Sequence, residues 1–180
     1  MLIIYNFSLL VSCPWTLTGR ARREIAYFLR QLGDEKPTIK PTVARGIIGV
    51  KTRLDSREVV QKLISFFNQD PSGFRYTLKW VPVDLWADSD IESLKGAVQE
   101  LRNKVKLGER WHMTLEKRRY TQYHKIDIIR TLAELIGEKV GLKNPDKILR
   151  IDIIGKYAGV SVISPSEIFS TTKLNVDEAN

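Results

Sequence analysis

The 180-residue sequence is poor in the residue types that build metal centres and disulfide-bonded folds. It contains one cysteine, Cys13, which excludes a disulfide framework within the chain and a zinc site made of several cysteines. Its two histidines, His112 and His124, have no third nitrogen or sulfur ligand at a metal-binding spacing. The sequence therefore predicts no metal site.

Long apolar segments are also missing. The longest one, at the N-terminus, is shorter than the roughly 18 residues that cross a membrane, and Asn6 and Ser8 interrupt it. No basic segment precedes it, which argues against a signal peptide. We therefore expect no membrane partner and a cytoplasmic location.

The common catalytic signatures are absent as well. There is no glycine-rich phosphate loop, no GxSxG nucleophile elbow and no HExxH zinc helix. Cys13 has no local base to activate it and is interpreted as a small apolar core residue. Asp88, Asp90 and Glu92 cluster at an expected helix start, where the helix dipole favours acids. The sequence predicts neither a catalytic site nor a bound cofactor, and hence not an enzyme.

Positive charge, in contrast, is plentiful. The formal net charge is +8, from 29 lysines and arginines against 21 aspartates and glutamates, and the pI is about 9.6. Residues 1–87 carry 13 basic and 7 acidic side chains, a net charge of +6, whereas residues 88–180 carry 16 and 14, a net charge of +2. This balance favours a polyanionic partner, with nucleic acid as the first candidate.

Hydrophobic periodicity predicts an α+β fold with two domains. Residues 1–82 show a β-α-β-β-α-β order, with strands in 2–13, 38–44, 47–51 and 74–80 and helices that begin near Thr18 and Asp55. Asp55 and Glu58 have the spacing of a capping box, and Thr18 can cap the first helix. This order is that of a ferredoxin-like domain, a four-stranded antiparallel sheet with both helices on one face.

Residues 83–89 are expected to form a linker, residues 90–170 a second α/β domain and residues 171–180 a disordered tail. In the second domain we expect a helix opened by a Ser89–Glu92 capping box, a strand at 111–116 and a helix capped by Thr121. A hairpin of strands 148–154 and 159–163 follows. The core face expected for the Thr121 helix comprises Ile126, Ile129, Leu132, Ala133 and Ile136.

Basic residues cluster in this second domain at points where elements begin or end. Lys117, Arg118 and Arg119 leave the strand, Lys125 begins the next helix, and Lys156 with Tyr157 occupies the hairpin tip. A helix N-terminus beside fixed cations suits a phosphate, and Tyr157 could stack on a base. If these tips converge, they form a groove for single-stranded or end-proximal RNA. The alternative is a solvated charged face.

A second basic group lies in the first expected helix. It consists of Arg20, Arg22 and Arg23, which either bind RNA or form only the solvent-exposed side of an amphipathic helix.

Several of these segments together resemble stand-alone THUMP-domain proteins. The resemblance rests on the residues 12–15 (SCPW), 19–24 (GRARRE), 32–34 (LGD), 116–118 (EKR), 144–147 (NPDK), 154–155 (IG) and 159–162 (GVSV). It extends over about residues 5–170 and is strongest to the archaeal and eukaryotic family that assists N4-acetylation of cytidine in tRNA.

The resemblance implies a ferredoxin-like domain followed by a THUMP domain that docks the acceptor end and CCA tail of tRNA. It also implies that a separate RNA acetyltransferase performs the chemistry, so that this chain is a tRNA-binding adaptor in tRNA modification. Two alternatives stay open: a tRNA-modifying enzyme whose active site has no recognisable motif, and a protein-interaction module whose basic charge is incidental.

Overall fold

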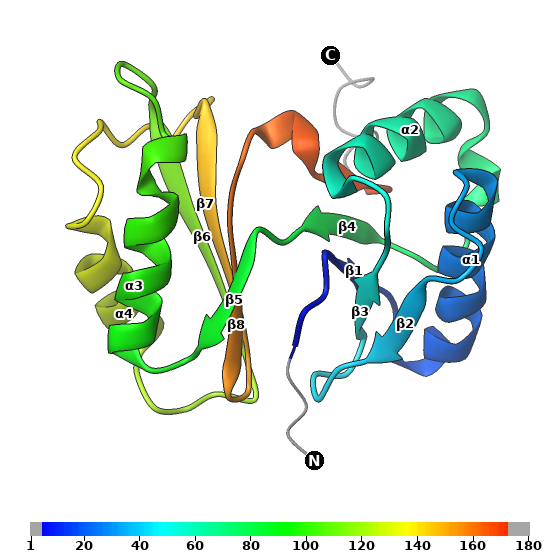
Figure 1. Ribbon diagram of the computed structural model, residues 1–180, viewed down its shortest axis with the longest axis horizontal. Coiled ribbons are helices and arrows are strands. Elements are labelled where there is room, and N and C mark those ends of the chain that lie inside the picture. Colours follow the sequence, from blue (N-terminus) through cyan, green and yellow to red (C-terminus); the bar gives the residue numbers. More distant parts are fainter. Residues whose placement is uncertain (1–4, 173–180) are drawn as a thin grey trace. The chain divides into compact units, whose positions relative to one another are not determined.

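The computed structural model describes residues 5–172, which divide into two compact units (Figure 1). Of the described residues, the first unit contains Phe7–Pro82 and 166–172, and the second contains Tyr5, Asn6 and Val83–Pro165. Among the described residues, no helix is long and apolar enough to cross a membrane.

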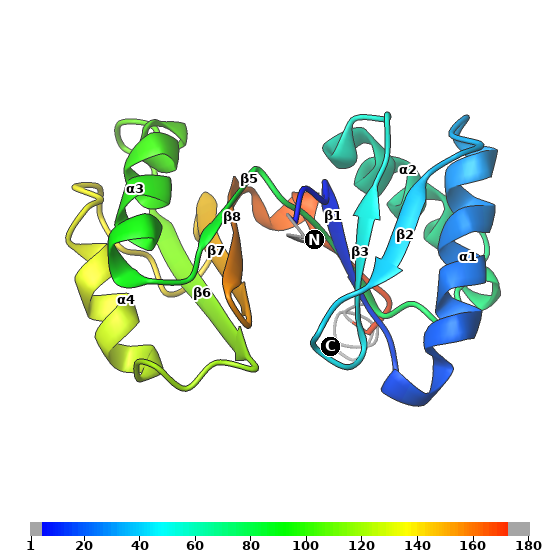
Figure 2. The same cartoon turned by 60° about the horizontal axis from the view of Figure 1, so that its bottom comes forward.

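The first unit is an antiparallel sheet covered by two helices. Its strands have the order β2-β3-β1-β4-β9, and both helices lie on one face of this sheet (Figure 2). The first four strands reproduce the order expected for a ferredoxin-like domain, and the predicted α+β fold class is confirmed. The elements are β1 (Leu9–Ser12), α1 (Thr18–Gln31), β2 (Thr38–Pro41), β3 (Ile47–Lys51), α2 (Ser56–Gln69), β4 (Lys79–Pro82) and β9 (Phe169–Ser170).

The core of this unit lies between the helices and the sheet. Ile25 and Leu29 of α1 and Leu63 of α2 are fully buried there, against Leu9 and Trp80 of the central strands. These apolar residues recur at the three- and four-residue spacings that place them on one helix face, so the periodicity of the sequence determined which face is buried.

The ends of the two helices follow from local chemistry. The backbone N–H of Asp34 donates to the carbonyl of Leu29, and Gly33 has a φ of 106°, which is the left-handed stop that the sequence predicted for α1. Asp55 caps α2 as predicted and accepts from the N–H groups of Arg57 and Glu58. Thr18 is instead the first residue of α1, and its hydroxyl donates to the carbonyl of Trp15 at 2.9 Å.

The strand predicted at 74–80 begins only at Lys79. The cause is Glu24 of α1, whose buried carboxylate accepts from the backbone N–H groups of Arg75 and Thr77, both at 2.7 Å, and from that of Tyr76. These N–H groups are therefore unavailable to a neighbouring strand, and the alternation of apolar residues from 74 onward reflects packing beside α1.

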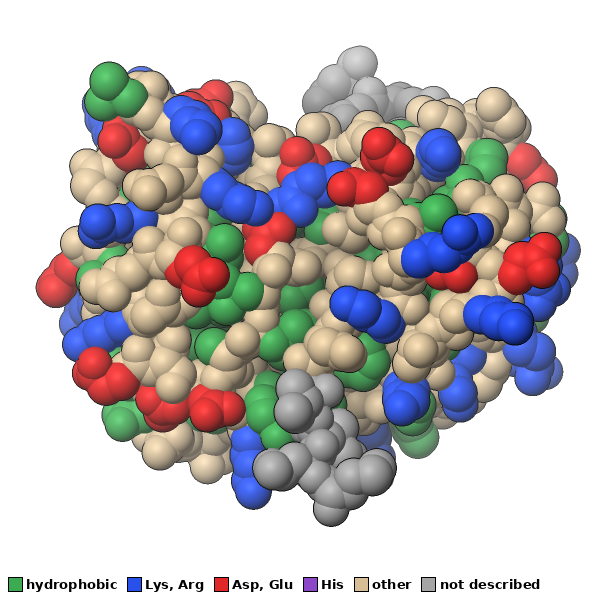
Figure 3. Space-filling view, in the orientation of Figure 1, with side chains coloured by type: hydrophobic (Ala, Val, Ile, Leu, Met, Phe, Trp, Pro, Cys, Tyr) green, Lys and Arg blue, Asp and Glu red, His purple; other side chains and the backbone are tan. Residues whose placement is uncertain are grey.

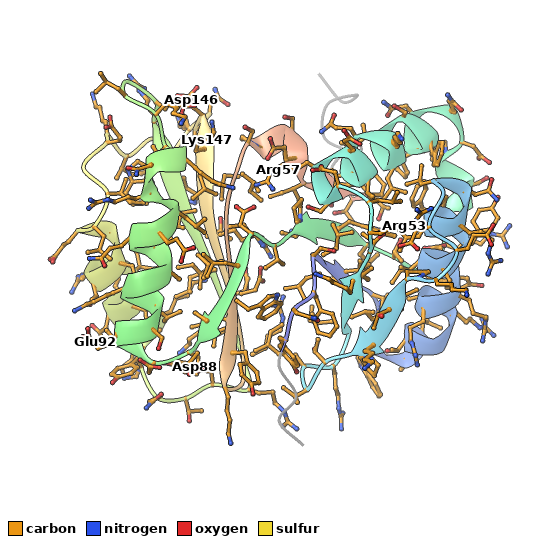
Figure 4. The ribbon with its side chains drawn as sticks, in the orientation of Figure 1. Arg53, Arg57, Asp88, Glu92, Asp146 and Lys147 are labelled. Carbon is orange, nitrogen blue, oxygen red and sulfur yellow. The ribbon has the colours of Figure 1, made fainter. Side chains whose placement is uncertain are left out.

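The C-terminal segment belongs to the first unit. Strand β9 pairs with β4, the guanidinium Nε of Arg57 lies 2.9 Å from a carboxylate oxygen of Glu167, and the amide of Gln61 donates to the carbonyl of Ser166. Arg57, at the N-terminal end of α2, is labelled in Figure 4. The tail was expected at 171–180, but the N–H of Thr171 donates to the carbonyl of Leu78. Residues 173–180 lie outside the described residues.

The second unit is a four-stranded mixed sheet with the order β5-β8-β7-β6, in which β6 and β7 are parallel. Its core lies between one face of this sheet and two helices, with Leu94, Leu115, Ile128 and Leu149 fully buried. Its elements are β5 (Leu85–Asp88), α3 (Ile91–Leu101), β6 (Trp111–Arg118), α4 (Lys125–Ala133), β7 (Lys147–Ile154) and β8 (Tyr157–Ile163).

The expected linker at 83–89 contains strand β5 instead. Leu85 and Ala87 of β5 pack on the core of the second unit, which accounts for the alternating apolar pattern of this short segment. Ser89 does not cap the following helix, because its hydroxyl donates to the carbonyl of Gly155, and Asp90 is the cap that accepts from Ser93.

Helix α4 starts three residues later than predicted, because its N-cap is His124 rather than Thr121 and its first residue is Lys125. Of the five residues expected on its core face, Leu132 and Ile136 are buried and Ile129 and Ala133 pack against the core, whereas Ile126 does not. Ile128 is fully buried, whereas Ile126 is 58% exposed. Residues two positions apart in a helix lie roughly 200° apart around its axis, so these two side chains point in nearly opposite directions.

Candidate nucleic-acid interface

Strands β6 and β7 bring Lys156 close to the basic residues 117–119. Because β6 and β7 run in parallel, their C-terminal ends meet at one edge of the sheet, where Arg118 is paired with Ile154. The N–H of Gly155 donates to the carbonyl of Arg118 at 2.9 Å, and Gly155 has a φ of 60° that permits a tight turn into β8. Lys156, at that turn, therefore lies beside the exit of β6. We call Lys117, Arg118, Arg119, Lys125 and Lys156 the strand-end cluster.

The chain changes direction directly after β6. Arg119 has a φ of 58°, a left-handed conformation that is uncommon outside glycine, and its side chain is exposed. Lys117 holds the loop that follows, because its ammonium donates to the carbonyl of Tyr123 at 2.7 Å and lies 5.8 Å from the centroid of the Tyr120 ring. Lys117 thus positions the loop as well as contributing charge.

Arg118 takes part in a buried ion-pair group. Its guanidinium lies 3.3 Å from Asp152, whose side chain is almost fully buried and also accepts two hydrogen bonds from Arg150. One carboxylate therefore serves two guanidinium groups, and the group of three keeps a net positive charge. Arg118 remains partly exposed at the edge of this group.

Lys125 is the first residue of α4 and is exposed. His124 precedes it as the N-cap residue without a side-chain hydrogen bond to the helix. The first N–H groups of α4 are consequently uncapped by a side chain, and together with the Lys125 ammonium they favour an anion at this end.

The aromatic residues near the cluster differ in their availability. Tyr157, predicted to stack on a base, is half-buried with its ring 4.9 Å from that of Tyr5. Tyr120 donates through its hydroxyl to the carbonyl of Ser89, and burial raises its pKa. Tyr123 is 40% exposed and is the ring of this loop that presents most surface to a ligand.

Acidic residues adjoin the strand-end cluster. Asp88 is paired with Tyr157 across β5 and β8, and the N–H of Ser89 donates to the carbonyl of Lys156. The acids at the start of α3 therefore lie beside the β7–β8 turn. Figure 4 labels Asp88 and Glu92 at this end of the unit, and Asp146 and Lys147 at the opposite end. The interface is basic on the side of β6 and α4 and acidic on the side of α3.

In the first unit, the arginines predicted as a second basic group are exposed along α1. The guanidinium of Arg22 donates to the carbonyl of Ile39 at 3.0 Å, that of Arg20 lies 5.8 Å from the centroid of the Tyr76 ring, and Arg23 faces solvent. Arg22 therefore connects α1 to the edge strand β2.

Sequence reasoning overlooked a pocket of about 490 Å³ in the first unit. Its lining includes Asp34, Lys36, Lys51 and Arg53, and Arg53 is labelled in Figure 4. Burial opposes ionisation of Asp34, but hydrogen bonds from the Thr52 hydroxyl and from two backbone N–H groups outweigh it and lower its pKa. The scattered positions of these residues in the sequence carried no signal of the pocket.

Other candidate chemistry is limited. Cys13 is buried as expected, and burial raises the pKa of its thiol, partly offset by the hydroxyl of Thr18. Residues 5–172 contain no group of three or more His, Cys, Asp or Glu side chains placed to hold a metal ion.

Three comparisons with known proteins bear on this interface. The family profile of the THUMP domain matches residues 88–163, a range that contains the whole strand-end cluster. No curated protein sequence matches the chain significantly.

Solved structures with a similar fold include PH1313 from Pyrococcus horikoshii Ot3, with 17% identity and a TM-score of 0.65 over 87% of this chain and 54% of that one. TrmN from Thermus thermophilus has 17% identity and a TM-score of 0.56 over 86% of this chain and 44% of its own. A 4-thiouridine synthetase in complex with RNA and ATP has 14% identity and a TM-score of 0.56 over 92% of this chain and 42% of the synthetase chain.

At these identities the likeness concerns the fold. The chain spans only about half of the length of these proteins. The family match and the α/β architecture described above agree, and residues 88–163 of this chain form a THUMP domain.

Proposed function

We propose that this protein binds tRNA through its THUMP domain and presents it to a separate RNA cytidine acetyltransferase, without catalysing the modification itself. The observation that carries the RNA-binding part is the convergence of the strand-end cluster with the uncapped N-terminus of α4 inside the THUMP domain. The same fold occurs in a 4-thiouridine synthetase that was crystallised with RNA, which supports an RNA ligand. The partner enzyme is supported by the family resemblance of the sequence.

The cluster residues divide into two groups by their existing contacts. Lys117 and Arg118 are engaged with the loop carbonyl and with Asp152, so part of their binding capacity is used within the protein. Arg119, Lys125 and Lys156 are exposed. We therefore assign the main phosphate contacts to these three residues, with Tyr123 as the stacking ring.

The acids beside the cluster restrict the path of the RNA. Phosphates are repelled from Asp88 and Asp90 at the start of α3, and attracted by Arg119 and by Lys125. The backbone of the bound strand therefore follows the side of β6 and α4. A single-stranded CCA end is narrow enough to do so, whereas a duplex presents phosphates on both sides.

A triple substitution tests this assignment. In Arg119→Ala, Lys125→Ala, Lys156→Ala, the slope of log K against log salt should become shallower by roughly 2–3, because three phosphate contacts are lost. The wild-type slope is expected at roughly −4 to −5 if about six phosphates are neutralised. The matched control is Lys106→Ala, Lys139→Ala, Lys143→Ala, which removes three exposed lysines of the same unit outside the cluster.

Affinity and slope are measured by fluorescence anisotropy with labelled tRNA and with tRNA that lacks its CCA end. A loss confined to the cluster variant and to CCA-bearing tRNA supports the proposal. Equal losses of affinity in both triple variants would instead indicate binding by overall charge. Unchanged affinity in both variants would show that the RNA interface lies outside the THUMP domain.

The adaptor role has its own test. The purified protein, incubated with tRNA, acetyl-CoA and ATP but without a partner, should yield no acetylated cytidine, and addition of an RNA cytidine acetyltransferase should produce it faster than that enzyme does alone. Product without the partner would identify this chain as the enzyme.

A further inference from the structure

An exposed tryptophan of the first unit has no role in the THUMP interface. Trp15 is 61% exposed, whereas Trp80 and Trp111 are at most 1% exposed and Trp86 is half-buried. A large aromatic ring in water forfeits the free energy of its burial, so such a ring at a surface indicates a binding role more strongly than a scattered leucine would.

The backbone that carries Trp15 is held firmly. Trp15 begins a short 3-10 turn in which the N–H of Leu17 donates to Pro14 and the Thr18 hydroxyl donates to the Trp15 carbonyl, both at 2.9 Å. The N–H of Cys13 donates to the carbonyl of Gly46 at 2.9 Å and so ties this turn to the loop between β2 and β3. A segment whose backbone is already held loses little backbone freedom when a ligand binds.

The same loop places a cation against the indole. The guanidinium carbon of Arg45 lies 5.3 Å from the centroid of the Trp15 ring, within the range of a cation–π contact. Gly46 makes this close approach feasible, because it has a φ of 77° and a Cβ there would lie 2.6 Å from the Cys13 carbonyl oxygen. An aromatic ring next to a planar guanidinium is a combination on which proteins stack unpaired bases.

The surrounding charge favours a polyanion. Residues 18–53 carry nine basic and three acidic side chains, which accounts for the whole net charge of +6 of residues 1–87. Two of the three acids, Glu24 and Asp34, are buried and accept hydrogen bonds within the protein, which leaves Glu35 as the exposed acid of this segment. Figure 3 shows Lys and Arg side chains over α1 and β2.

We propose that Trp15 and Arg45 form a platform on which the first unit stacks an unpaired nucleobase of an RNA ligand, while the basic side chains of α1 bind adjoining phosphates. This inference rests on RNA binding as proposed above and adds a second contact that requires single-stranded RNA. The platform discriminates unpaired from paired segments, because bases inside a duplex are already stacked on their neighbours.

Tryptophan fluorescence tests the platform directly. Trp15 is the tryptophan most accessible to the neutral quencher acrylamide, and the difference between wild type and Trp15→Phe isolates its signal. An oligoadenylate of about ten nucleotides should shield this signal, and a blunt-ended RNA duplex of the same length should not. Shielding by both ligands, or by neither, would overturn the proposal.

Affinity for the oligoadenylate gives a second readout. Trp15→Leu should weaken binding about 5- to 150-fold, the range for loss of one stacked base, whereas Trp15→Phe should retain most of the affinity. Tyr27→Leu is the matched control, since Tyr27 is a 55% exposed aromatic residue on α1 outside the platform. Unchanged affinity in Trp15→Leu would refute the platform.

The two proposals fail in different ways. If tRNA does not bind the wild-type protein, the proposed function fails. If tRNA binds and the strand-end triple variant weakens it, but RNA leaves Trp15 accessible, only the platform fails. Shielding of Trp15 by an RNA acetyltransferase and not by RNA would identify the surface around Trp15 as a protein-docking site. That result would also refute the nucleobase platform.

Discussion

Replacement of Glu24 by glutamine should destabilise the first unit strongly, although the two side chains have nearly the same shape. The buried carboxylate accepts from three successive N–H groups, those of Arg75, Tyr76 and Thr77, and both of its oxygens are used. A glutamine keeps one acceptor oxygen and turns an N–H₂ group toward a backbone N–H. At least one of the three N–H groups then loses its acceptor in the protein.

The magnitude follows from these contacts. A hydrogen bond to a charged group contributes about 1.5–3 kcal/mol, and the bonds that remain become neutral and weaker. We therefore expect the free energy of unfolding to fall by about 2–4 kcal/mol. With a urea dependence of about 2 kcal/mol per molar, the unfolding midpoint of the first unit should fall by about 1–2 M.

Urea unfolding followed by circular dichroism measures the loss, and amide hydrogen exchange shows where it occurs. Protection should disappear first at the three N–H groups that Glu24 binds. Glu35→Gln is the control, because Glu35 is exposed in the same unit and its substitution should change stability by less than about 0.5 kcal/mol. If Glu24→Gln is as stable as this control, the carboxylate does not hold residues 75–77.

Two further predictions concern the first unit. The pKa of Asp34 is lowered in the folded state, so its stabilising contribution should be present above the unfolded pKa of about 3.9 and disappear as the pH falls through the lower folded value. Urea unfolding between pH 2 and pH 6 should accordingly be less steeply pH-dependent in Asp34→Asn than in wild type, and equal dependence would contradict this assignment. Gly46→Ala should lower stability by about 1–3 kcal/mol in thermal unfolding, because its φ of 77° and the Cys13 carbonyl oxygen both exclude a Cβ; a neutral substitution would show that the loop relaxes at no cost.

The ferredoxin-like order of the first unit was predictable because each of its elements carries its own signal. The apolar residues of α1 and α2 recur at helical spacing, and Asp55 and Gly33 mark a helix start and a helix stop through bonds within a few residues. Where local signals misled, a distant group had intervened. Residues 74–78 have the alternation of a strand, but Glu24, some 50 residues earlier in the chain, takes the N–H groups that a strand would use.

The candidate sites divide in the same way. Lys117, Arg118 and Arg119 could be singled out because they are adjacent in sequence, yet the contacts that occupy Lys117 and Arg118 depend on the loop carbonyl of Tyr123 and on Asp152 in the neighbouring strand. Trp15 and Arg45 are 30 residues apart and gave no combined signal. They meet because the N–H of Cys13 donates to the carbonyl of Gly46, directly beyond the last paired residues of β1 and β3.

By itself, the sequence determined the fold class, the position of the excess positive charge and the basic residues at the exit of β6. Periodicity and composition are properties of neighbouring residues, and they are sufficient for these conclusions. The tertiary structure alone decided which cations remain exposed, that acids adjoin the strand-end cluster, and that one tryptophan stays in water beside an arginine. These are contacts between residues far apart in the chain, and their geometry exists only once the strands have paired.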